Sequence, residues 1–119
     1  MNELFEIYIA KTIKKNINHF VSMQDKRYKL LINEQTTRKS FPIKPDIVIE
    51  HEGAARLIID TKWKRISSSY HRHGLKREDL YQMYAYLTRY EDSTSALLLY
   101  PHNPDISAES GDVLESWFL

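Results

Sequence analysis

The sequence contains no cysteine, which excludes disulfides, zinc ribbons, iron–sulfur clusters and thiol nucleophiles. No apolar run approaches the roughly 20 residues that a membrane-spanning helix requires. The amphipathic N-terminus carries carboxylates at Glu3 and Glu6, which a cleavable signal peptide does not. With 119 residues, 42% hydrophobic and 12% aromatic, the chain has the size and composition of one folded domain. We therefore expect a single domain, residues 1–119, in a soluble cytoplasmic protein with no membrane partner.

The charged residues are distributed unevenly along the chain. All 17 Lys and Arg lie in residues 1–90 with 10 Asp and Glu, a net charge of +7, whereas residues 91–119 hold six acids and no Lys or Arg. A basic body can bind a polyanion such as nucleic acid, to which an acidic tail contributes no phosphate contact. Ordinary scatter of surface charge explains the same distribution equally well.

Hydrophobic periodicity predicts two helices and four strands. The helices span residues 3–21, with the apolar stripe Ile9, Ile13, Ile17 and Phe20, and residues 76–90, with the buried stripe Leu80, Met83, Tyr84 and Leu87. The strands span residues 27–33, 46–50, 56–64 and 95–100, the last one buried; residues 34–44 and 67–74 are expected to be loops. Gly53 lies between two β-branched runs, which indicates a hairpin. This order of elements predicts an α/β fold with a mixed β-sheet flanked by helices.

Glu6 is unusual within the first helix. It precedes Ile13 by seven residues, so at about 100° per residue it falls on the apolar stripe. A carboxylate that faces a core is costly unless something neutralises it. The alternative is a misplaced surface acid.

Strand alternation places Asp60, Lys62 and Lys64 on one face of the strand over residues 56–64. Asp46 opens the partner strand after Pro45, and the hairpin can bring it near Asp60, although the sequence does not fix the register. Two carboxylates and a lysine suit metal-assisted phosphodiester hydrolysis, because Mg²⁺ prefers oxygen ligands and keeps several waters. The alternative for an isolated Asp-x-Lys is a cross-strand salt bridge with a solvated lysine.

Together, Pro45-Asp46, Asp60-Thr61-Lys62 and a helix bearing Gln82 and Tyr86 resemble the PD-(D/E)xK nuclease superfamily, and the Gln-x-x-x-Tyr element is similar to that of its RecB-like branch. The chain is more similar still to the nuclease domain of the McrC-type subunits of modification-dependent (5-methylcytosine) restriction systems. This resemblance covers nearly the whole chain up to Pro101 and rests on five runs: NELFEIYIA, FPIKPDIVIE, RLIIDTKWK, REDLYQMYAY and ALLLYP.

The resemblance implies a restriction-endonuclease-like fold and a Mg²⁺-dependent endodeoxyribonuclease, in which Mn²⁺ can substitute. It implies Lys62 as the catalytic lysine, supported by Gln82 and Tyr86, which as an i, i+4 pair share a helical face. We expect that face to lie opposite the apolar stripe of the helix. The implied metal ligands are Asp46, Asp60, Glu6 and the backbone carbonyl of Thr61.

The resemblance also implies two partners, double-stranded DNA and an AAA+ GTPase of the McrB type. The sequence has no P-loop, so any nucleotide hydrolysis must come from that partner. McrC-type proteins carry a further N-terminal region, so this chain is expected to be the C-terminal nuclease part or a fragment, with residues 102–119 as an acidic tail of uncertain structure. Two other functions stay open: a RecB-like DNA repair or phage nuclease, and a catalytically silent DNA-binding or scaffold module.

Three further side chains could contact DNA. Lys64 could bind a phosphate or act as a backup for Lys62, but Lys62 fits the Asp-x-Lys spacing. His71 and His73, in the predicted loop over residues 67–74, could touch phosphate or metal, although solvated loop histidines are more common.

Overall fold

The computed structural model describes residues 3–17, 19–68, 74–93, 95–107 and 109–116. Within these residues, its helices and strands are α1 (Glu3–Asn16), β1 (Phe20–Met23), β2 (Lys29–Ile32), β3 (Lys39–Pro42), β4 (Ile47–His51), β5 (Ala54–Thr61), α2 (Arg77–Arg89) and β6 (Ser95–Leu99). The predicted mixed α/β class is confirmed. Neither described helix combines the length and apolar character needed to cross a membrane.

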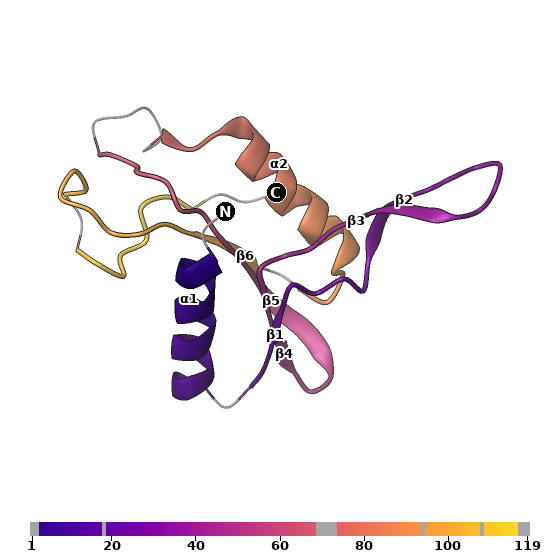
Figure 1. Cartoon of the computed structure of the whole chain (residues 1–119), viewed down its shortest axis with the longest axis horizontal. Coiled ribbons are helices and arrows are strands. Elements are labelled where there is room, and N and C mark those ends of the chain that lie inside the picture. Colours follow the sequence, from indigo (N-terminus) through magenta and orange to yellow (C-terminus); the bar gives the residue numbers. More distant parts are fainter. Residues whose placement is uncertain (1–2, 18, 69–73, 94, 108, 117–119) are drawn as a thin grey trace.

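The main sheet has four strands in the order β1-β4-β5-β6. It is mixed, because β4 pairs antiparallel with β1 and β5 while β6 runs parallel to β5. Alternation along β4 separates two cores: Ile47 and Ile49 pack on the side of Ala10 in α1, whereas Val48 packs on the side of Met83 in α2. The two helices therefore flank opposite faces of the sheet (Figure 1).

The predicted hairpin is present as β4 and β5. Its two-residue turn is formed by Glu52 and Gly53, both with positive φ (54° and 78°), as a type I′ turn requires. A β-bulge follows, because Ile49 pairs with Leu57 while Glu50 pairs with Ala55, which leaves one extra residue on β5. Beyond the bulge the register pairs Ile47 with Ile59, so Asp46 comes opposite Asp60 one step further.

The strands β2 and β3 form a separate antiparallel ribbon, which projects from the body beyond α2 (Figure 1). One hydrogen bond continues the pairing of the two strands at the base of the ribbon, and two contacts fasten this base to the end of α2. The Ile43 amide donates to the Tyr28 carbonyl at 3.1 Å, Arg89 Nε donates to the Lys29 carbonyl at 3.1 Å, and the Tyr28 and Tyr90 rings meet edge to face at 4.7 Å.

A buried polar network joins β1, β4 and the end of α2. The carboxylate of Asp25 accepts hydrogen bonds from the Arg27 guanidinium, the closest at 2.7 Å, and from the Tyr90 hydroxyl at 2.8 Å. Arg27 also pairs with Glu50. Burial acts to raise the pKa of Asp25, but the hydrogen bonds from Arg27 and Tyr90 and the charge of Arg27 together outweigh it and lower this pKa below its ordinary value.

Four details of the sequence-based prediction are wrong. The first helix ends at Asn16 rather than at residue 21, and Phe20, assigned to its apolar stripe, lies 65% exposed on β1. Phe20 continues the helical spacing of the three isoleucines by coincidence, and the four-residue strand β1 is too short to show a strand period of its own. Residues 34–44, expected to be a loop, contain β3.

The other two errors concern burial. Tyr84, expected in the core, is 56% exposed, because the arc of α2 that meets the sheet runs through Met83 and Tyr86. The strand over residues 95–100, expected to be buried, corresponds to the edge strand β6, on which Leu97 is 41% exposed. His71 and His73 lie outside the described residues.

Candidate active site

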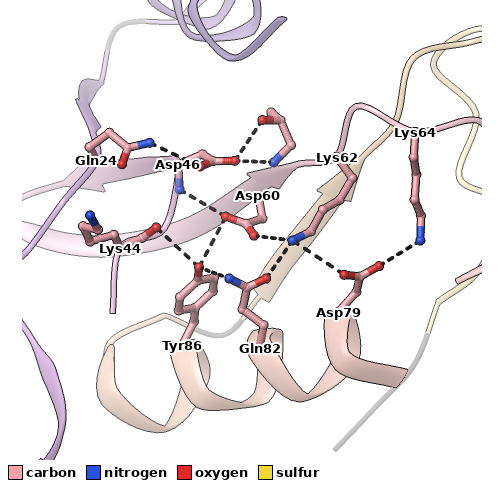
Figure 2. A network of polar contacts seen from close by, with 10 residues as sticks. Gln24, Lys44, Asp46, Asp60, Lys62, Lys64, Asp79, Gln82 and Tyr86 are labelled. Carbon is pink, nitrogen blue, oxygen red and sulfur yellow. Dashed lines mark hydrogen bonds and ion pairs between the residues drawn. The ribbon is translucent and has the colours of Figure 1, made fainter. Parts of the chain in front are cut away.

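Asp46 and Asp60 meet at the end of the β4–β5 hairpin, where both are almost fully buried, at 0% and 1% exposure. The Asp46 amide donates to Asp60 Oδ1 at 3.2 Å. Asp46 Oδ2 accepts two hydrogen bonds of 2.8 Å, from the amide and from the hydroxyl of Thr61. These bonds fix the two carboxylates side by side, as the sequence predicted from the hairpin (Figure 2).

Lys62 follows β5 directly, and its amide donates to the Leu99 carbonyl at 2.9 Å, which keeps the backbone alongside β6. Its ammonium reaches both the sheet and α2. Lys62 Nζ lies 3.2 Å from Asp60 Oδ2 and 3.6 Å from Asp79 Oδ1, and it donates to Gln82 Oε1 at 2.7 Å (Figure 2). The structure thus brings Lys62 to Asp60, as the Asp-x-Lys spacing predicted.

Helix α2 supports this pair through Gln82 and Tyr86. Gln82 Nε2 donates to the Tyr86 hydroxyl at 2.9 Å, and that hydroxyl lies 3.4 Å from both Asp60 Oδ1 and the Lys44 carbonyl oxygen. Tyr86 is 2% exposed and belongs to the same core cluster as Met83. The expectation that the Gln82–Tyr86 face lies opposite the apolar stripe is therefore wrong for Tyr86: its ring packs in the core and its hydroxyl reaches the carboxylate.

Glu6 is buried at 3% exposure, which rules out the alternative of a surface acid. It reaches the carboxylate pair through Gln24, at the end of β1. Gln24 Nε2 donates to Glu6 Oε1 at 2.7 Å and to Asp46 Oδ1 at 3.3 Å, and the Gln24 amide donates to the Asp46 carbonyl at 3.0 Å. Glu6 thus joins the site through an amide rather than by direct contact.

The carboxylates of the site carry more negative charge than the Lys62 ammonium compensates. The pKa of Asp60 is raised to about 6, chiefly by burial and then by the negative charge of Asp46, while Lys62 acts against both effects. Burial also raises the pKa of Glu6, with Gln24 acting against it and the charges of Asp46 and Glu3 adding to it. Shifted carboxyl groups of this kind, buried beside a second acid, gather at functional sites.

The donor set suits a hard divalent cation. Among the described residues, Asp60 Oδ2 is buried without a hydrogen bond, although it faces the Lys62 ammonium, and Asp46 Oδ1 accepts one hydrogen bond, of 3.3 Å, from Gln24. Across the part of the chain that the structure describes, no three His, Asp or Glu side chains are grouped for one metal ion. Two carboxylates and several waters form a normal Mg²⁺ site, so Asp46 and Asp60 fit this ion, with Glu6 further back behind Gln24.

Sequence reasoning missed three contributors to the site. Gln24 lies in a segment that carries no motif, and Lys44, directly before Pro45-Asp46, contributes through its backbone carbonyl, which no motif position marks. Asp79, in the first turn of α2, holds both lysines: its Oδ2 lies 3.2 Å from Lys64 Nζ, which also donates to the Gly74 carbonyl at 3.3 Å. The only signal for Asp79 is its position three residues before Gln82, on the same side of the helix.

The fold and the site define a mixed α/β domain whose buried acid pair and lysine lie between a β-hairpin and a helix. The chain belongs to the family described as “McrBC 5-methylcytosine restriction system component”, whose family model matches residues 1–101. The match includes every residue of the site described above. No curated protein and no solved structure matches the chain. The resemblance seen in the sequence is thus confirmed at the level of the restriction system.

Proposed function

We propose that this chain is the nuclease part of a McrC-type subunit, a PD-(D/E)xK domain with a restriction-endonuclease-like fold that cleaves double-stranded DNA. The observation that carries the proposal is the pair Asp46 and Asp60, buried opposite each other, with Lys62 Nζ 3.2 Å from Asp60 Oδ2. Membership of the McrBC family supports DNA as the substrate and makes a RecB-like repair or phage nuclease the weaker candidate.

In this proposal Asp46 and Asp60 hold Mg²⁺, for which Mn²⁺ can substitute. The ion would polarise the phosphoryl group and lower the pKa of a bound water. Thr61 fixes Asp46 through two hydrogen bonds, and the role of its backbone carbonyl as a further ligand stays a prediction, as does that of Glu6. A bound cation would compensate the charge of the two acids and so remove the repulsion between them. A structural salt bridge with Lys62 would not require a second acid at this position.

Lys62 is the residue that we assign to the chemistry. Its ammonium lies beside Asp60, where it can orient a water or stabilise negative charge that develops on the phosphoryl oxygens. Gln82 and Asp79 hold the ammonium in place from α2, and the Tyr86 hydroxyl lies beside Asp60.

The partner proposed for the chain is an AAA+ GTPase of the McrB type. In this proposal the partner supplies the nucleotide hydrolysis. Family membership supports this arrangement, because the family comprises components of one restriction system. The cytoplasmic location predicted from the sequence stays a prediction.

The test combines this chain with its McrB-type partner, GTP and a 5-methylcytosine-containing duplex, and measures single-turnover cleavage beside a DNA-binding titration. We expect cleavage to require Mg²⁺ or Mn²⁺ and to stop in EDTA. We expect Lys62→Ala to lower the cleavage rate by on the order of a hundredfold or more with little loss of DNA affinity, because a group that acts on the transition state affects rate rather than binding.

The matched control is Lys64→Ala, which removes the same charge two residues away and should leave most of the cleavage rate intact. Cleavage that persists in EDTA would remove the metal from the mechanism. If neither lysine affects cleavage by the complex, the silent-scaffold alternative replaces the nuclease proposal.

A further inference from the structure

The β2–β3 ribbon exposes large apolar side chains that nothing in the described chain covers. Leu31, Ile32 and Phe41 are 54%, 61% and 65% exposed. The ribbon has only two strands, and neither is hydrogen-bonded to the main sheet. A lone two-stranded ribbon is marginally stable in water, and clustered exposed apolar side chains mark an interaction surface.

The ribbon nevertheless has a defined conformation at its tip. Asn33 Oδ1 accepts hydrogen bonds from the amides of Gln35 and Thr36 at 2.9 and 3.0 Å. The Asn33 amide donates to the Arg38 carbonyl and the Thr37 amide donates to the Asn33 carbonyl, both at 2.8 Å. The tip is thus closed by its own hydrogen bonds and the base by contacts to α2, which leaves the faces of the ribbon open.

Phe41 adopts a left-handed backbone conformation, with φ of 61°. This conformation is uncommon for a residue with a bulky side chain and costs about 1–2 kcal/mol. Burial of the Phe41 ring does not offset this cost, because the side chain is largely exposed. Strain on an exposed aromatic residue is expected where the side chain contacts a partner.

The charge on the ribbon indicates the kind of partner. Residues 29–42 carry the three cations Lys29, Arg38 and Lys39 and the single acid Glu34. Lys29, Arg38 and Lys39 are all exposed. Such a surface is complementary to a DNA duplex. The cations can contact the phosphates on either side of the major groove, and the apolar side chains can contact the thymine methyl groups inside it.

The ribbon is also connected directly to the candidate active site. β3 ends at Pro42, and four residues later the chain reaches Asp46. A cleft of about 350 Å³ lies between them, lined by Pro42 and Lys44 on one side and by Gln82 and Tyr86 of α2 on the other. A duplex that contacts the ribbon therefore continues towards the carboxylate pair.

We propose that the β2–β3 ribbon is a DNA-contacting element that lies in the major groove beside the cleaved strand; this inference rests on the proposed function. The major groove admits a two-stranded β-ribbon. From Pro42 to Thr36 at the tip is six residues, which span at most about 20 Å at 3.4 Å per residue, because the strand itself begins at Lys39. At about 3.4 Å per base pair the ribbon covers about six base pairs to one side of the scissile phosphate.

The test measures duplex binding by the 119-residue chain without Mg²⁺, over a series of salt concentrations. We expect the double variant Arg38→Ala/Lys39→Ala to lose about tenfold or more in affinity and to reduce the salt slope by about two, one for each lost phosphate contact. Phe41→Ser should weaken binding without changing the slope, because it removes no charge. Thermal unfolding of each variant checks that the exposed substitutions leave the fold intact.

The matched control is Lys14→Ala/Lys15→Ala, which removes the same charge from the exposed end of α1. An equal loss of affinity in this control would show general charge attraction and would overturn the assignment. Hydroxyl-radical footprinting should show that the Arg38→Ala/Lys39→Ala variant loses protection over about six base pairs on one side only. An unchanged footprint would also overturn the assignment. So would a ribbon variant that binds DNA normally but no longer binds the AAA+ partner.

These experiments distinguish a failure of the ribbon assignment from a failure of the proposed nuclease function. If cleavage depends on Lys62 but not on the ribbon, the proposed function stands and the ribbon assignment fails. If the ribbon variants weaken DNA binding but the complex does not cleave, the ribbon assignment stands and the proposed function fails. If neither the chain nor the complex binds a duplex, the ribbon assignment fails outright.

Discussion

Replacing Asp60 by Asn should stabilise the protein at neutral and alkaline pH. The pKa of Asp60 is raised from 3.8 to about 6, chiefly by burial and then by the charge of Asp46. Between these two values the folded chain binds a proton that the unfolded chain does not, so stability falls as the pH rises through this range. At 1.36 kcal/mol per pKa unit, the ionised carboxylate costs about 3 kcal/mol above pH 6.

Asparagine removes this charge and can keep the acceptor that binds the Asp46 amide, while its amide group meets the Lys62 ammonium less favourably than a carboxylate does. We therefore expect Asp60→Asn to gain about 1–3 kcal/mol at pH 8, or about 4–12 °C in Tm for a domain of this size. The gain should shrink towards pH 4, where the wild-type carboxyl is itself protonated. Thermal and urea unfolding in EDTA at pH 4, 6 and 8 measures both effects.

Asp25→Asn is the matched control, because the pKa of Asp25 is lowered where that of Asp60 is raised. The stabilisation from Asp25 is present above its unfolded pKa and disappears as the pH falls through its folded pKa. This variant should therefore lose stability at pH 8 and approach wild type in acid. Added Mg²⁺ should raise the Tm of wild type more than that of Asp60→Asn, because in the proposed function both acids of the pair hold the ion. If Asp60→Asn is no more stable than wild type at pH 8, Asp60 is not the uncompensated acid described here.

Three further substitutions test other parts of the structure. Glu6→Gln, which removes a buried charge with a raised pKa, should increase the Tm at pH 8 while lowering Mg²⁺ affinity in a titration; unchanged affinity would exclude Glu6 from the metal site. Asp79→Asn should slow cleavage by about tenfold and leave DNA affinity unchanged, because it weakens the ion pair that positions the Lys62 ammonium. Cleavage rate and DNA affinity, measured in parallel, check that only the rate changes. Glu52→Asn, at φ of 54° in the hairpin turn, should add about 0.5–1 kcal/mol in urea unfolding with no change in cleavage, and a loss of stability would contradict the type I′ assignment.

The sequence predicted the parts of the site that depend on short-range patterns. Alternating β-branched residues and Gly53 were enough to place the hairpin, and its presence brings Asp46 and Asp60 together. The interior position of Glu6 followed from helical periodicity. These predictions succeeded because each depends on residues within one element or one turn, where backbone geometry fixes which side chains share a face.

The parts that the sequence did not predict depend on contacts between distant segments. Gln24 lies 18 residues from Glu6 and 22 from Asp46, and no local pattern marks an amide as the link between two acids. Strands β1 and β3 have four residues each, which is too few to establish a period against the background of neighbouring turns. Tyr86 was assigned to the wrong face because a residue with an apolar ring and a polar hydroxyl fits either face by pattern alone.

The β-bulge beside Arg56 has a consequence for how such sites vary between related chains. If the same residues formed a regular ladder without the bulge, the two-residue turn would pair Asp46 with Ile59, and Asp60 would project from the opposite face of the sheet. The proximity of the two acids therefore depends on whether the number of residues between them is odd or even, and not on their identity alone. A single insertion or deletion that leaves the bulge in place would separate the carboxylates, although both motifs would still be present in the sequence. Relatives whose hairpin differs by one residue should retain the site only where a bulge is also gained or lost.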